Sequence, residues 1–172
     1  TRLVSDWSSD VCSSDLNRDR PADRGYVVVR SWEHELKQPD GSLERQVVEY
    51  GWDYARAVAV ERTRRPDGQA TGERDVVGET LRATEEEQAW AFDLVRREPG
   101  LKAAATAPDV LLYGGFILME PGDAHCHLRS RCVYVFASQG DESRKVVEAI
   151  VDLQANRVVY PNYKPETTRP LD

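Results

Sequence analysis

Hydrophobic and polar residues follow a short-period pattern along most of the chain, and this pattern predicts eight strands. Val, Ile, Tyr, Phe and Trp gather in short segments bounded by Gly, Pro, Asp and Asn, which is typical of antiparallel strands joined by tight turns. Pro-Asp-Gly at 39–41 and again at 66–68 predicts two such turns, and Gly114-Gly115 predicts a bulge. The predicted strands span residues 26–36, 43–50, 52–62, 73–78, 109–119, 131–138, 145–153 and 157–160.

A single long segment, residues 84–97, has helical periodicity instead. Thr84 can cap the first turn, and Glu87 lies three residues later, so the two residues predict a capping box. Pro99-Gly100 ends the helix, and residues 101–105 are expected to add one short turn. The apolar stripe that must be buried against the strands consists of Ala91, Leu94 and Val95.

Four strands, one helix and four more strands predict an α+β fold. We expect an antiparallel meander sheet of about eight strands curled over the main helix. The chain has 172 residues, of which 40% are hydrophobic, and this suits one compact domain. We place a linker at 17–25, the domain at 26–160 and a tail at 161–172. Two fused halves, 26–80 and 83–160, are an alternative division of the domain.

The first residues are not expected to be native protein. Residues 6–16, Asp-Trp-Ser-Ser-Asp-Val-Cys-Ser-Ser-Asp-Leu, match the translation of a common short-read sequencing adapter at every position. We therefore set residues 1–16 aside, as one would a fusion scar, and expect an assembled environmental sequence whose native start is missing. A signal peptide could have been lost with that start. The cysteines that remain are Cys126 and Cys132.

The net charge limits the partners that we expect. The chain carries 23 Lys and Arg against 30 Asp and Glu, a net charge of −7, which disfavours binding to nucleic acid. Its apolar runs are only a few residues long, so we expect no membrane span.

The second half of the sequence resembles a known class of modules. Residues 83–87, Ala-Thr-Glu-Glu-Glu, open the helix, and residues 147–159 read as a strand, a short turn and a strand that closes on Val-Val. These features are similar to those of cystatin-like modules in PepSY domains and in the small N-terminal domains of copper amine oxidases. The resemblance implies an extracytoplasmic location and a binding or inhibitory role, and it implies no catalytic residue.

The segment from Asp123 to Cys132 concentrates the remaining candidate chemistry. If it is a strand, His125 and His127 point to the same face and could bind copper or zinc, with Asp123 or Glu120 as a further ligand. Two histidines are few for a tight site, and exposed histidines on a hairpin are the simpler interpretation.

The two cysteines of this segment face each other across the predicted hairpin. A disulfide between Cys126 and Cys132 would staple it and would require an oxidising compartment. A redox-active or metal-binding thiol pair is the alternative, although no Cys-x-x-Cys is present. The neighbouring Arg129 and Arg131 fit either a small anion-binding rim or a solvated turn.

The sequence therefore supports three hypotheses about function. The first is a non-enzymatic, secreted or periplasmic module of cystatin-like type that needs no cofactor and binds a protein partner, or assembles, through its open sheet edges. The second is a copper- or zinc-binding protein that uses His125 and His127. The third is a small enzyme with a pocket between helix and sheet, for which Asp93, Glu120 and His34 are available titratable groups without an assigned catalytic role.

Overall fold

The computed structural model describes residues 19–140 and 144–164. The adapter-like segment 1–16 and the tail beyond residue 164 lie outside the described residues. In the segment expected to be a linker, Pro21–Arg24 form a single 3₁₀ turn, η2, and Pro21 is buried. Across the described part of the chain, no helix is both long and apolar enough to cross a membrane.

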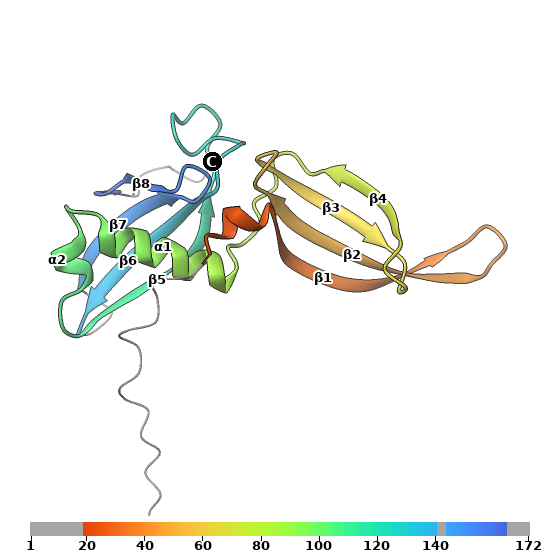
Figure 1. Cartoon of the computed structure of the whole chain (residues 1–172), viewed down its shortest axis with the longest axis horizontal. Helices are drawn as coiled ribbons and strands as arrows, with labels where there is room; N and C mark the ends of the chain where they lie inside the picture. The colour runs from red at the N-terminus through yellow and green to blue at the C-terminus, as the bar shows by residue number, and fades with distance from the viewer. Residues whose placement is uncertain (1–18, 141–143, 165–172) are drawn as a thin grey trace, which may run out of the picture.

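The strands form two antiparallel sheets of four strands each, in the orders β1-β2-β3-β4 and β5-β6-β7-β8. The α+β class is confirmed, but the single sheet of about eight strands curled over one helix is wrong. The chain between β4 and β5 forms both helices, and β5 then starts a new sheet instead of pairing with β4 (Figure 1). The strands are β1 (Tyr26–Lys37), β2 (Leu43–Asp53), β3 (Val58–Arg64), β4 (Ala70–Asp75), β5 (Val110–Leu118), β6 (Cys132–Gln139), β7 (Lys145–Asp152) and β8 (Arg157–Tyr160).

The turn between β2 and β3 differs from the prediction. Trp52 and Asp53 end β2, whereas the sequence pattern placed them at the start of the third strand. The Asp53 side chain accepts a hydrogen bond from the Arg56 N–H over 3.0 Å, and Ala57 has a φ of 51°. This turn contains no Gly or Pro, so it lacks the residues by which the other turns were predicted.

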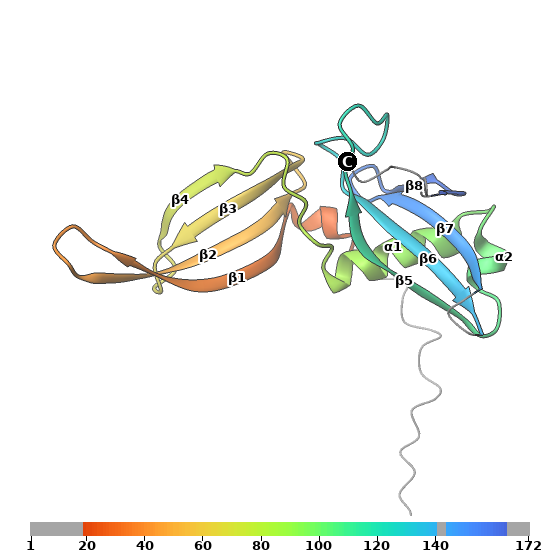
Figure 2. The ribbon, with the colours of Figure 1, turned by 180° about the vertical axis from the view of Figure 1, so that it is seen from behind.

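The main helix is confirmed. Helix α1 (Glu85–Arg97) begins after Thr84, whose hydroxyl accepts from the Glu87 N–H over 3.2 Å. Glu87 Oε2 in turn accepts from the Thr84 N–H over 2.8 Å, which completes the capping box. The short helix α2 (Lys102–Ala105) follows, as expected. Figures 1 and 2, seen from opposite sides, show that α1 covers one face of the second sheet only.

The two sheets share one hydrophobic core. Trp90 and Val95 of α1 are buried together with Val133 of β6, and the same cluster contains Val27 and Trp52 of the first sheet. Polar contacts cross this junction as well. The Trp52 indole N–H donates to Gln154 Oε1 over 3.2 Å, and the Gln154 side chain donates to the Tyr54 carbonyl over 2.9 Å. The sheets are therefore fastened to each other where β2 ends and β7 ends.

Two features of the second sheet position the residues discussed below. The predicted bulge is confirmed, because the β5–β6 register shifts between Gly114 and Phe116 and Gly115 has a φ of 106°. The predicted Cys/His hairpin is wrong: residues 119–131 form a loop without strands, and β6 begins only at Cys132.

Candidate functional site: a groove between β1 and the linker to α1

The described surface contains an open groove of about 890 Å³. One side is the first half of β1, and the other is the end of the segment at residues 76–84, here called the linker, which joins β4 to α1 (Figure 1). The residues that line it are Arg24, Tyr26, Val27, Val28, Val29, Arg82, Ala83, Thr84, Glu85, Glu86 and Gln88.

The β1 side of the groove is a free sheet edge. Within the described ranges, β1 has β2 as its only strand partner. The pairing with β2 shifts register between Val28 and Arg30, and the Val28 side chain is 42% exposed. An edge with unpaired backbone groups and an exposed valine is a ready template for another extended segment.

Charged side chains line the groove as well. The Arg24 guanidinium lies 2.5 Å from Glu86 Oε2, and this ion pair joins η2 to the first turn of α1. Both side chains are about half exposed, so the pair contributes little to stability.

The linker is held in place by hydrogen bonds to β5 and to Arg131. The Ala83 N–H donates to the Gly115 carbonyl of the β5 bulge over 3.2 Å. The carbonyls of Leu81 and Arg82 accept from the Arg131 guanidinium over 2.6 and 2.9 Å. The linker is therefore an ordered wall.

Behind this wall lies a buried cluster of charged and polar side chains, namely Tyr54, Glu87 and Arg131. Arg131 is 1% exposed and Glu87 is fully buried. Arg131 Nε and Nη2 donate to the two oxygens of Glu87 over 3.0 and 2.9 Å, and the Tyr54 hydroxyl donates to Glu87 Oε1 over 2.7 Å. The buried Glu87 carboxylate thus accepts hydrogen bonds from Tyr54, which follows β2, and from Arg131, which precedes β6.

The sequence-based interpretation of Arg131 as a rim or turn residue is wrong. An arginine in a loop next to Arg129 is ordinarily exposed, and its partner Glu87 is far away in the sequence. The sequence signal for the Glu87–Arg131 pair is the capping-box glutamate itself. One of its oxygens bonds to the Thr84 N–H, which leaves the other to accept from a second donor.

The environment of Glu87 lowers its pKa. Burial by itself raises the pKa, but the hydrogen bonds and charge of Arg131 outweigh it, with further hydrogen bonds from the Thr84 N–H and the Tyr54 hydroxyl. Burial also raises the pKa of Tyr54, and the Glu87 charge beside it raises that pKa further. At neutral pH the cluster therefore holds an ionised Glu87 and a neutral Tyr54.

The lowered pKa of Glu87 predicts an acid-sensitive stability. The contribution of ionised Glu87 to the free energy of unfolding is complete above the carboxyl's unfolded pKa of about 4.3. It is lost as pH falls through the lower folded-state pKa. We expect the free energy of unfolding, measured by urea titration across this range, to fall less steeply with acid in Glu87→Gln than in the parent. Equal slopes in the two proteins would contradict this interpretation.

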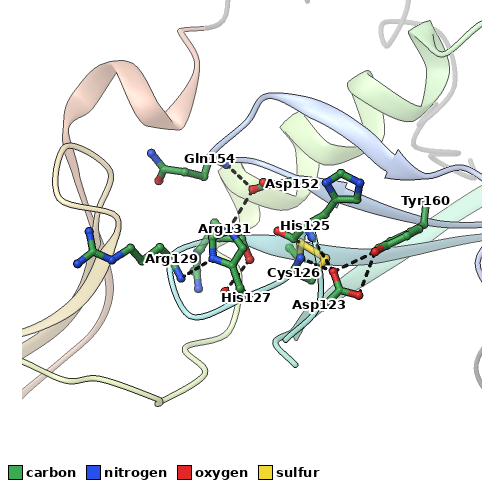
Figure 3. The surroundings of a disulfide bond; sticks show 11 residues. Asp123, His125, Cys126, His127, Arg129, Arg131, Asp152, Gln154 and Tyr160 are labelled. Carbon is green, nitrogen blue, oxygen red and sulfur yellow. Dashed lines mark hydrogen bonds between the residues drawn. A yellow bond between two sulfur atoms is a disulfide. The ribbon is translucent and has the colours of Figure 1, made fainter. Parts of the chain in front are cut away.

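A disulfide joins the loop at 119–131 to the first residue of β6 (Figure 3). Cys126 and Cys132 are joined with an S–S distance of 2.16 Å and a Cα–Cα distance of 5.5 Å, and both are fully buried. Asp123 organises the loop, since one of its oxygens accepts from the N–H groups of His125 and Cys126 over 2.7 Å each. The Tyr160 hydroxyl donates to Asp123 over 2.9 Å, which ties the loop to β8.

The two histidines of this loop have different neighbours. The His125 ring packs edge-on against Tyr160, with centroids 5.4 Å apart, whereas His127 is exposed and its Nδ1 accepts from the Arg129 N–H over 3.2 Å. Among residues 19–140 and 144–164, no group of three or more His, Cys, Asp or Glu side chains is placed to hold a metal ion. Binding of copper or zinc by His125 and His127 stays a prediction.

The titratable groups named for an enzyme are not brought together. His34 lies exposed on β1, opposite Gln46 of β2, in the first sheet. Asp93 lies on α1, where its carboxylate pairs with Arg96 and Arg97. Glu120 follows β5 in the disulfide loop. The three side chains therefore belong to separate parts of the fold.

A scan of the sequence against protein-family models finds no match, and neither does a search of curated proteins. The resemblance to cystatin-like modules of PepSY domains and copper amine oxidases stays a prediction.

Proposed function

We propose that this protein is a non-enzymatic binding module that takes up an extended segment of a partner protein along the edge of β1. The observation that carries the proposal is the groove of about 890 Å³ between that edge and the linker wall. An added strand gains main-chain hydrogen bonds from the edge, and alternate side chains of the segment enter the groove.

The chemistry of the groove favours a segment with apolar residues at alternating positions. Val28 and Val29 of β1 are among its lining residues, and the charges of Arg24 and Glu86 already neutralise each other. A neutral or weakly charged segment therefore suits it better than a strongly charged one. We place the protein outside the cytoplasm, because the Cys126–Cys132 pair requires an oxidising compartment to persist.

The proposal is tested with peptides. Selection from a random peptide library displayed on phage, with the purified chain as bait, is expected to enrich segments with alternating apolar residues. Val28→Arg places a long charged side chain in the groove, and we expect it to weaken binding of an enriched peptide about tenfold or more, as measured by fluorescence anisotropy.

Val77→Arg is the matched control, because Val77 is also an exposed valine, at 71%, and does not line the groove. Its affinity for the peptide is expected to equal that of the parent. The proposal is wrong if no peptide family is enriched, or if Val28→Arg binds the enriched peptide as well as Val77→Arg does.

A further inference from the structure

Arg131 reaches the back of the groove wall although it does not line the groove itself. Its Nη1 donates to the Leu81 carbonyl and its Nη2 to the Arg82 carbonyl, over 2.6 and 2.9 Å. Leu81 and Arg82 belong to the linker between β4 and α1, and Arg82 and the two residues after it form the linker side of the groove.

The same guanidinium group also hydrogen-bonds to the first turn of α1. Nε and Nη2 donate to the two oxygens of Glu87, so one rigid, planar group holds the linker and the helix at the same time. A lysine has one ammonium nitrogen on a flexible stem and lacks the planar fork that reaches these acceptors together.

Arg131 is itself fixed on the remaining sides. Its N–H donates to Asp152 Oδ1 over 3.2 Å, and its carbonyl accepts from the Leu153 N–H over 2.9 Å. Its guanidinium carbon lies 5.4 Å from the centroid of the Trp52 ring, and the next residue, Cys132, is in the disulfide. The group that holds the linker is therefore anchored to both sheets.

We infer that Arg131 is a positioning residue that fixes the linker wall of the groove and so keeps the groove open for an extended segment. The inference rests on the proposed function, because the groove is the proposed binding site. A wall held in place before binding leaves less chain to be ordered when the partner segment enters, and this improves affinity.

Hydrogen exchange tests the positioning role without any ligand. In Arg131→Lys we expect the amides of Ala83 and Thr84 to exchange about tenfold faster than in the parent, because the charge-assisted bonds that hold the linker are lost. The amides of Val133 and Val135, in the middle of β6, serve as the reference for global unfolding. Arg129→Lys, which changes an exposed arginine two residues away, is expected to leave all four rates unchanged.

The result that would overturn the inference is an Arg131→Lys protein in which Ala83 and Thr84 exchange as in the parent, or in which β6 accelerates by the same factor. Peptide affinity separates the two proposals. If the inference and the proposed function both hold, Arg131→Lys also weakens binding of the phage-selected peptide, whereas Arg129→Lys does not. Faster linker exchange in a protein that enriches no peptide would sustain the inference about the wall and reject the proposed function.

Discussion

Glu87→Gln is expected to lower the free energy of unfolding by about 3–5 kcal/mol, because it leaves the Arg131 cation buried without its counter-charge. Arg131 is fully enclosed by Trp52, the linker and α1, so water cannot replace the lost carboxylate. The substitution keeps the shape of the side chain and one acceptor oxygen, but its amide nitrogen faces donors that the second carboxylate oxygen accepts from in the parent. The loss therefore reports on both the missing charge and the broken hydrogen bonds. Equilibrium unfolding in urea, followed by tryptophan fluorescence, measures it.

Glu86→Gln is the matched control, one residue away on the same turn. The Glu86 side chain is 54% exposed and forms its ion pair with Arg24 at the surface, where water screens the charges. Its replacement is therefore expected to cost only about 0–1 kcal/mol. A double variant, Glu87→Gln with Arg131→Met, should recover part of the lost stability, since it removes the unpaired charge. If the two substitutions lower the free energy of unfolding equally, the buried Glu87–Arg131 pair contributes no more to stability than the exposed Glu86–Arg24 pair, and this prediction is wrong.

Removal of the disulfide has the second largest expected effect. In Cys126→Ala/Cys132→Ala we expect stability to fall by about 2–3 kcal/mol, because the unfolded chain loses a constraint that closes a short loop. Both sulfur atoms are buried with Ile150, so part of the loss comes from packing. Urea unfolding of the parent with and without dithiothreitol, beside the double variant, measures the effect.

The reductant provides the internal control for this prediction. It should destabilise the parent and leave the double alanine variant unchanged, because that variant has no bond to reduce. A parent protein whose unfolding midpoint is the same in reductant, and whose intact mass shows two free thiols in its absence, would favour the free-thiol alternative and remove the argument for an oxidising compartment.

Local signals in the sequence predicted the local structure well. The capping box of Thr84 and Glu87 and the Pro99-Gly100 stop correctly predicted α1, because each acts within one helical turn. Turns rich in Pro, Asp and Gly were likewise found between β1 and β2 and between β3 and β4. The turn at residues 54–57 was missed because an Asp53 side-chain hydrogen bond closes it instead of a glycine.

The arrangement of the strands was not predictable in the same way. Both one curled sheet and two separate sheets bury the same alternating residues, and only the pairing of distant strands distinguishes them. The candidate site depends on such distant contacts throughout. Arg131 was judged from its neighbours in the loop, whereas its partners Leu81, Arg82 and Glu87 come from a different part of the chain. Open sheet edges in general were expected as docking surfaces, but the sequence singled out neither the edge of β1 nor the linker opposite to it.

The polar contacts between Trp52, Tyr54 and Gln154 have a consequence for how this fold can be inherited. A recombination breakpoint in the linker would separate Trp52 from Gln154 and Tyr54 from Glu87, and it would expose the hydrophobic core that both sheets share. Neither portion could then be transferred to another gene without new residues to cover that surface. Selection would therefore keep the two sheets together as one heritable unit, even though each has its own strand order.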